Sequence, residues 1–527
     1  MTSGRHFNTT GPVRPNEHYC IDPLKRIDLP EVERLIERGK YFVLHAPRQT
    51  GKTTCLLALV SHLMTTGSYR CAYANVENAQ AARGNYEKGI PLILDQIAAD
   101  AAFFGGETYP RDHVAEIRSR IGPGAQLSAL LEGWSAADGR PLVVLLDEVD
   151  ALLGDTLVSM LRQLRSGYSR RPSAFPLSVI LCGVRDVRDY RIHSDLDGAI
   201  ITGGSAFNIK AASLRLGDFS EPETRELLLQ HTAETGQAWT EEALREIYRL
   251  TQGQPWLVNA IAYEVTDAIP RGRDRSQNLD ADMVTEARER LILRRDTHID
   301  QLADKLREDR VRRVIEPILR NDIPDASLSE DDIQYAMDLG LVRRGPEGIE
   351  VANPIYREVI PRHLTAIMQA RIEPTHQPAW YIRSDGFLDM VKLLGAFQQF
   401  FRENSEAWIE RFEYREAGPQ LLLQAFLQRI VNGGGRVERE YGLGRMRTDL
   451  LIVWNAPTGV QRCVIEAKLV RGSREATIEQ GLRQTRAYMD RCGTAEGHLI
   501  LFDRHSGLSW DERIFREARD GIVIWGM

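Results

Sequence analysis

One eight-residue segment, APRQTGKT at residues 46–53, constrains the fold of this chain more than any other feature. The apolar run YFVLH precedes it, and the apolar helical pattern CLLALVSHLM follows it closely. A strand, a loop and a helix in this order predict a phosphate-binding loop, because loop N–H groups and a helix N-terminus together cradle an anion. A chance match in an ordinary turn is the alternative, and the flanking strand and helix argue against it.

The conserved chemistry of such a loop depends on its lysine and the hydroxyl after it. Lys52 would contact the β and γ phosphates of ATP, and the Thr53 hydroxyl would ligate Mg²⁺. Alanine occupies position 46, where the first glycine of the pattern usually stands. The predicted nucleotide-binding residues are Ala46, Pro47, Arg48, Gln49, Thr50, Gly51, Lys52, Thr53 and Thr54.

A second apolar strand, in PLVVLLDEVD at residues 141–150, ends in acidic residues. Asp147 would complete the Mg²⁺ shell, and Glu148 would act as the base that polarises the attacking water. Such a carboxylate pair is typical of P-loop ATPases with an additional strand and a catalytic glutamate. A buried strand that simply ends at a solvated acidic turn is the alternative.

The chain of 527 residues is long enough for three or four domains. Strand-length apolar runs alternate with helical patterns over residues 30–215, which predicts an α/β fold with a parallel sheet. Polar stretches predict loops at 105–112, an interdomain connection at 270–278 and a boundary at 371–380. The predicted divisions are an ATPase core with an N-terminal strap (1–215), a helical lid (216–279), a winged-helix-like domain (280–372), a linker (373–400) and a second α/β domain (401–527).

The first 270 residues resemble the AAA-like ATPases related to signal-transduction ATPases with numerous domains and to archaeal-type ATPases. The strings that carry this resemblance are APRQTGKTT, VVLLDEVD, SVILCGVRDVRDY and TQGQPWLVNAIA. The resemblance implies that Arg185, after the fourth strand, senses the γ-phosphate. It also implies that Gly253-Gln254-Pro255 in the lid closes over the base, and that the strap FNTTGPVRPNEHYCIDP packs near the adenine. A solvated arginine and a plain helix boundary are the alternatives.

Residues 305–365 have the pattern of a winged helix. Ser329 would cap a helix, and LVRRGPEGIEVANP would form a two-stranded wing turning at residues 345–348. The helix carries Glu330, Asp331, Asp332 and Asp338. Because these acids would repel DNA phosphates, we expect a packing or regulatory role.

Two further strands are predicted in TDLLIVW and RCVIEAKLV, joined by the turn NAPTG. Side chains two apart on a strand share a face, so Glu466 and Lys468 would lie together. If the strands pair, Asp449 approaches the same face. Asp449 and Glu466 would then offer hard oxygen ligands for Mg²⁺ or Mn²⁺, while Lys468 would orient a hydrolytic water. A salt-bridged, half-exposed strand is the alternative.

This arrangement resembles the PD-(D/E)xK nucleases over residues 401–527, although Thr448 stands where the family's proline is usual. The resemblance implies an acidic residue on an upstream helix, for which Glu416 fits and Glu413 is the fallback. It also implies a role for Gln484, which shares a helix face with Tyr488 in a QxxxY pattern.

The net charge of −7 taken alone argues against nucleic acid as a partner. Residues 429–491, however, hold 12 Lys/Arg against 7 Asp/Glu, which suits a phosphate backbone. Candidate contacts are Arg436, Arg439, Arg445 and Arg447. Six scattered cysteines indicate reduced thiols rather than a zinc site, and the absence of a signal-peptide core or a membrane span suggests a cytoplasmic protein.

These patterns predict an ATPase that drives or regulates a metal-dependent nuclease acting on DNA, with defence against foreign DNA as an analogy from fold. Two other classes stay open. One is an ATP-switched scaffold that grips nucleic acid without cutting it. The other is a signalling switch whose output is a homo-oligomer.

Overall fold

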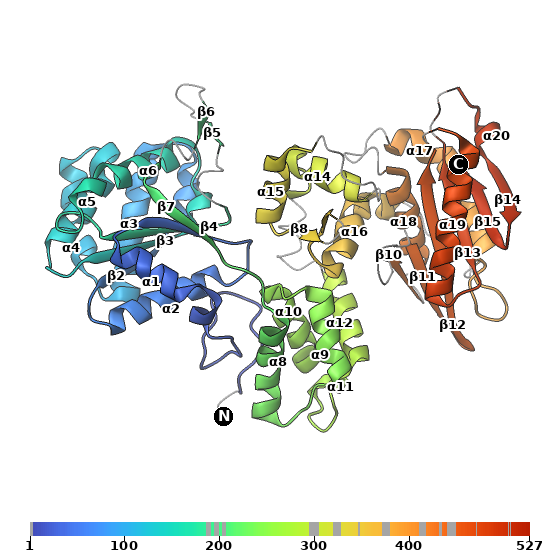
Figure 1. Cartoon of the computed structure of the whole chain (residues 1–527), viewed down its shortest axis with the longest axis horizontal. Helices are drawn as coiled ribbons and strands as arrows, with labels where there is room; N and C mark the ends of the chain where they lie inside the picture. The colour runs from blue at the N-terminus through green and yellow to red at the C-terminus, as the bar shows by residue number, and fades with distance from the viewer. Residues whose placement is uncertain are drawn as a thin grey trace. The chain divides into compact units, whose positions relative to one another are not determined.

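The computed structural model describes residues 4–185, 191–193, 200–202, 207–294, 305–319, 328–345, 348–371, 380–409, 418–431, 435–439, 450–470, 472–503, 505 and 507–527. The chain forms two compact units, Met1–Arg294 with Met337–Gly340, and Arg295–Ala336 with Leu341–Met527 (Figure 1). Within the described residues, no helix combines the length and apolar character that crossing a bilayer requires.

The first unit contains a five-stranded parallel sheet in the order β2-β3-β4-β1-β7. Its strands are β1 (Tyr41–His45), β2 (Arg70–Asn75), β3 (Leu142–Asp147), β4 (Ser178–Gly183) and β7 (Lys210–Arg215). The predicted α/β fold is confirmed, and β4 is the additional strand, inserted between β1 and β3. Because all five strands are parallel, the phosphate loop after β1 and the acids after β3 lie at the same edge.

Helices cover both faces of this sheet, which explains why strands β1 to β4 are buried almost throughout. One hydrophobic core joins the sheet to α1 (Leu29–Glu37) and α2 (Lys52–Thr65). The other joins it to α3 (Tyr86–Gly105), α5 (Pro123–Ala136) and α6 (Gly154–Ser166). Shorter elements of this unit are η1 (Pro23–Arg26), η2 (Glu77–Ala82), η3 (Val149–Ala151), η4 (Tyr168–Arg170), β5 (Arg191–His193) and β6 (Ile200–Thr202).

The loop predicted at residues 105–112 is shorter than expected. Helix α4 (Tyr109–Arg120) begins inside it and packs against α3 and α5. Proline is favourable in the first turn of a helix, where its missing N–H has no partner to lose, and Pro110 occupies that position. The polar residues at 105–112 therefore include the first turn of α4 and do not form one continuous loop.

The helical lid comprises α8 (Glu221–Thr235), α9 (Glu241–Thr251), α10 (Pro255–Tyr263), η6 (Glu264–Ala268), α11 (Pro270–Arg273) and α12 (Ala281–Arg294). Helix α12 packs against α9 and α10, so this packing crosses the division expected after residue 279. Residues 270–278, predicted as an interdomain connection, belong to the lid instead. The buried Gln237 amide anchors them by donating to the carbonyls of Gly272 and Gln277, each at 3.0 Å.

The second unit begins with α14 (Asp309–Leu319) and α15 (Glu330–Asp338), followed by an antiparallel pair, β8 (Val342–Gly345) and β9 (Gly348–Val351), and then α16 (Pro354–Arg371). Helix α15 starts directly after Ser329, and the two short strands fall where the wing was predicted. This order of helices and hairpin agrees with the predicted pattern; the winged-helix assignment itself stays a prediction.

A six-stranded mixed sheet, in the order β10-β11-β12-β13-β15-β14, forms the rest of the second unit. Helices α17 and α18 share a hydrophobic core with one face, and α19 packs on the other. Met390 and Phe397 lie in that core, so the residues from 390 belong to this domain rather than to the linker predicted at 373–400. The elements are α17 (Met390–Ile409), α18 (Gly418–Val431), β10 (Gly435–Arg439), β11 (Leu450–Ala456), β12 (Gly459–Leu469), α19 (Arg474–Cys492), β13 (Gly497–Phe502), α20 (Trp510–Arg513), β14 (Phe515–Arg519) and β15 (Ile522–Gly526).

Candidate functional site

The phosphate loop connects β1 to α2 in the predicted way. Gly51 directly precedes α2 with a φ of 91°, a conformation that glycine adopts without strain. The ammonium of Lys52 is buried and donates to the carbonyls of Ala46 (3.1 Å) and Pro47 (3.0 Å). The lysine is therefore folded back over its own loop, with its charge held at the centre of the anion cradle.

Asp147 and Thr53 meet across the sheet edge. The Thr53 hydroxyl donates to Asp147 Oδ2 at 2.7 Å, and the Tyr73 hydroxyl donates to the same oxygen at 3.1 Å. Burial, followed by the charge of Asp147, raises the pKa of Tyr73, so its phenol stays a donor. A hydroxyl and a carboxylate oxygen side by side fit Mg²⁺, which prefers hard oxygen ligands.

Glu148 follows directly and is held in the left-handed region, with a φ of 55°. Its backbone N–H donates to Asp147 Oδ1 at 2.9 Å, which helps to orient the Asp147 carboxylate. Burial raises the pKa of Glu148 from 4.5 to about 7, while the nearby Lys52 opposes the shift. A carboxyl group with a pKa near neutrality is suited to accept a proton from water.

Arg26, which the sequence patterns did not single out, connects the phosphate loop to the start of the lid. Its guanidinium donates to the carbonyl of Thr50 in the loop and, at 2.6 Å, to the carbonyl of Gly217. It also stacks over the Phe219 ring, 4.6 Å from the centroid. Phe219 in turn donates its N–H to the Gly253 carbonyl at 2.8 Å, so a chain of contacts runs from the loop into the lid.

A cavity of about 120 Å³ lies beside the loop within the first unit. Gln49, Gly51 and Thr54 line it from the loop side. The N-terminal strap forms another wall and is tied down at two points: Val13 N–H donates to Thr54 Oγ1 at 3.1 Å, and Trp256 Nε1 donates to the Thr9 carbonyl at 2.9 Å. The cavity is therefore in a position to hold the remainder of a ligand whose phosphate is bound in the loop.

The resemblance also assigned roles to the Gly253-Gln254-Pro255 motif and to Arg185. Pro255 of the Gly253-Gln254-Pro255 motif lines the cavity, and Gln254 caps α10 by accepting the N–H of Leu257 at 2.6 Å. Arg185 lies two residues beyond β4, at the same edge of the sheet as the phosphate loop. Its predicted role as a γ-phosphate sensor stays a prediction.

In the second unit, Glu466 and Lys468 lie together on β12. Lys468 Nζ is 2.6 Å from Glu466 Oε1, and the Glu466 side chain is only 1% exposed. Strand β12 pairs with β11 in an antiparallel arrangement, as the hairpin prediction required. On α19, Tyr488 packs against Leu451 and Val464 of these strands, and Gln484 is half-buried one turn earlier.

The other predicted members of this site lie outside the described residues. These are Asp449, Glu416, the fallback Glu413, Arg445 and Arg447, together with the side chains of Arg436 and Arg439. Of the remaining arginines, Arg474 pairs with Asp503 at 3.1 Å and Arg486 pairs with Asp520. Part of the local positive charge is therefore neutralised within the domain.

The acids of α15 are largely occupied within the protein. Asp332 accepts hydrogen bonds from Arg310 Nε at 2.8 Å and from Arg313 Nη2 at 2.7 Å. Glu330 pairs with Arg344 of β8, and Asp338 is buried. This pairing agrees with the expectation that α15 serves packing rather than contact with DNA.

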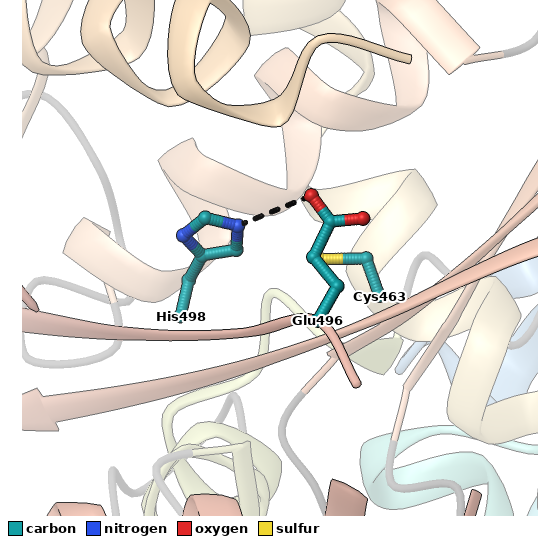
Figure 2. A group of neighbouring side chains, drawn as sticks. All are labelled: Cys463, Glu496 and His498. Atoms are coloured by element: carbon teal, nitrogen blue, oxygen red, sulfur yellow. Dashed lines mark ion pairs between the residues drawn. The ribbon is translucent and has the colours of Figure 1, made fainter. Parts of the chain in front are cut away.

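One three-residue cluster with metal-ligand chemistry occurs among the described residues: Cys463, Glu496 and His498 (Figure 2). His498 Nε2 is 3.8 Å from Glu496 Oε1, and Trp525 Nε1 donates to His498 Nδ1 at 3.2 Å. Because Nδ1 accepts, the proton of the neutral ring is on Nε2, which leaves no lone pair for a metal. Burial also raises the pKa of the Cys463 thiol, which disfavours the thiolate form that a metal ion would need.

No protein-family model matches this chain, and no curated protein matches it. Among solved structures, a Walker-type ATPase of Pyrococcus abyssi is 14% identical, covers 67% of this chain and 99% of its own, and has a TM-score of 0.45. Cdc6p from Pyrobaculum aerophilum is 14% identical over 66% and 93%, with a TM-score of 0.35. The RuvB Holliday junction branch migration motor of Thermotoga maritima is 14% identical over 64% and 93%, with a TM-score of 0.33. With TM-scores below 0.5, the functional argument rests on the geometry of the site itself.

Proposed function

We propose that the first unit binds ATP with Mg²⁺ and hydrolyses it. The observation that carries this proposal is the 2.7 Å contact between Thr53 Oγ1 of α2 and Asp147 Oδ2 of β3, which brings two Mg²⁺ ligand groups together beside the phosphate loop. Mg²⁺ held there would neutralise charge on the phosphates. Lys52 would hold the phosphates, Glu148 would accept the proton of the attacking water, and Arg185 would contact the γ-phosphate.

Phosphate release from ATP tests this function. Replacement of Lys52 by alanine removes the ammonium that is hydrogen-bonded to the Ala46 and Pro47 carbonyls of the loop, and we expect hydrolysis to fall about 10²–10³-fold. Lys88→Ala, at an exposed lysine on α3, is the matched control and should retain wild-type activity. Equal activity of Lys52→Ala and wild type would overturn the assignment.

We further propose that the second unit is a metal-dependent nuclease acting on DNA, regulated or driven by the ATPase. This proposal is supported by the close contact of Glu466 with Lys468 on a strand end, the combination that binds a cation and orients a water. Asp449 would share Mg²⁺ or Mn²⁺ with Glu466, and Glu416 and Gln484 would assist.

Cleavage of plasmid and linear DNA with Mg²⁺ or Mn²⁺, with and without ATP, separates the alternatives. A nuclease loses cleavage in Lys468→Ala and keeps it in Lys392→Ala, an exposed lysine of the same unit. Metal-independent DNA binding without products favours the non-cleaving scaffold. Growth in mass on adding ATP, measured by light scattering, favours the signalling switch, and an ATP effect that survives Lys52→Ala contradicts coupling.

A further inference from the structure

The cavity beside the phosphate loop has one wall made by α10 of the lid. Phe219, Pro255 and Trp256 give that side apolar and aromatic surface, which suits a flat heterocycle. Gly51 and Thr54 line the cavity and also belong to the phosphate-binding segment. The cavity therefore continues from the phosphates toward the position of a nucleotide base.

Asn259 lines this cavity and is only 8% exposed. Its Nδ2 donates to the Pro255 carbonyl at 2.8 Å. This bond fixes the orientation of the amide, because the flipped form would set two oxygens against each other. Its Oδ1 is buried without a hydrogen-bond partner among the described residues. A buried acceptor without a hydrogen bond destabilises the folded protein, and a donor group on a bound ligand would satisfy it.

We propose that Asn259 Oδ1 selects adenine by accepting a hydrogen bond from its exocyclic 6-amino group. This inference rests on the nucleotide-binding function proposed above and names the group that chooses the base. Guanine carries a carbonyl at the same ring position, so its oxygen would face the Asn259 oxygen and both acceptors would lack a donor. Rejection of such a base comes from the unpaired buried groups rather than from size.

Competition against a fluorescent ADP analogue on the full-length chain tests the proposal. The competitors are ADP, GDP and purine riboside diphosphate, which equals ADP without its 6-amino group. We expect wild type to bind ADP about tenfold or more tightly than purine riboside diphosphate, the factor typical of one buried hydrogen bond. In Asn259→Leu, which keeps a similar volume without the acceptor, the two ligands should bind equally. Asn78→Leu, at an exposed asparagine, should discriminate as wild type does.

The outcomes separate the selection proposal from the proposed function. Equal binding of ADP and purine riboside diphosphate by wild type overturns the role of Asn259, even if Asn259→Leu fails to fold. Persistent discrimination in a folded Asn259→Leu overturns it as well. Failure of wild type to bind any of the three nucleotides instead overturns the nucleotide-binding function itself.

Discussion

The phosphate-loop site and the Glu466–Lys468 site differ in how many chain segments converge on them. At the first, α2 and β2 bring the hydroxyls of Thr53 and Tyr73 onto the Asp147 carboxylate at the end of β3, and Lys52 is bonded to the loop that follows β1. At the second, the contact that can be described lies within one strand: Lys468 Nζ is 2.6 Å from Glu466 Oε1, and the other predicted members lie outside the described residues.

This difference explains why the phosphate-loop motif supports its predicted site more strongly than the Glu466–Lys468 motif supports the predicted nuclease site. A contact between residues 94 apart in sequence, such as Thr53 with Asp147, requires the whole sheet to be arranged correctly. A pair at i and i+2 needs only an extended strand, which any salt-bridged strand provides. The nucleotide site is therefore supported by topology, and the nuclease site by local pattern.

The largest expected effect is the loss of the Asp147 carboxylate. In Asp147→Asn, the Mg²⁺ ligand and the acceptor for Thr53 and Tyr73 are weakened together, so ATP hydrolysis should fall about 10³-fold. Phosphate release measured over a Mg²⁺ series checks this. DNA cleavage without ATP should be unchanged in the same variant; a parallel loss of both activities would mean that the two sites are not separate in function.

Glu148→Gln should retain nucleotide binding and lose about 10²–10⁴-fold in hydrolysis, because the base is removed. In wild type the rate should rise with pH through about 7, the pKa of Glu148. The folded pKa of about 7 exceeds the ordinary 4.5, so ionisation of Glu148 costs stability as pH rises through this window. The melting temperature of wild type should therefore fall relative to Glu148→Gln between these pH values; parallel curves would contradict the burial.

The variant Glu466→Gln tests the predicted nuclease site, which has the weaker structural support of the two sites. If Glu466 binds a catalytic metal, metal-dependent cleavage should fall at least about 10²-fold, since such an ion contributes several kcal/mol. Thermal unfolding measured with and without Mg²⁺ gives a second readout. Stabilisation by Mg²⁺ in wild type and not in the variant supports a metal site, whereas unchanged cleavage identifies a structural ion pair.

The smallest effect is expected for a substitution of Asp332, which should change the free energy of unfolding rather than a catalytic rate. Burial would raise the pKa of Asp332, but hydrogen bonds from Arg310 and Arg313 outweigh it and hold the pKa below 3.8. Asp332→Asn should cost about 1–3 kcal/mol in the free energy of unfolding at pH 7. The folded pKa is lowered, so this contribution is present above the ordinary value and is lost as pH falls through the folded one. Urea unfolding at pH 7 and at low pH measures it, and tighter DNA binding without loss of stability would instead assign α15 to a nucleic-acid interface, because the substitution removes a charge that repels phosphate.

Periodicity predicted what depends on local pattern. Strands β1 and β3, the phosphate loop and the start of α15 lie within a residue or two of their predicted positions. Polar stretches were harder to interpret, because the composition that predicts a loop at 105–112 also suits the first turn of α4. The place of α12 in the lid and of α17 in the C-terminal core depends on tertiary packing, which a local pattern does not contain.

The same limit applies to individual site residues. Tyr73 and Arg26 reach the nucleotide site through side chains that start far away in sequence, on a strand and a short helix. In the sequence, the only sign of Asn259 is that it is a polar amide within the apolar run PWLVNAIAY of α10. Only the structure showed that its oxygen lacks a partner beside the cavity.

The position of Arg26 has a consequence for timing. A single guanidinium is bonded both to the loop that would grip phosphate and to the chain leading into the lid. When the loop moves on binding or releasing phosphate, the Thr50 carbonyl moves with it, and Arg26 transmits that movement to the segment that starts the lid. We therefore expect release of the nucleotide and movement of the lid to be coupled through this residue.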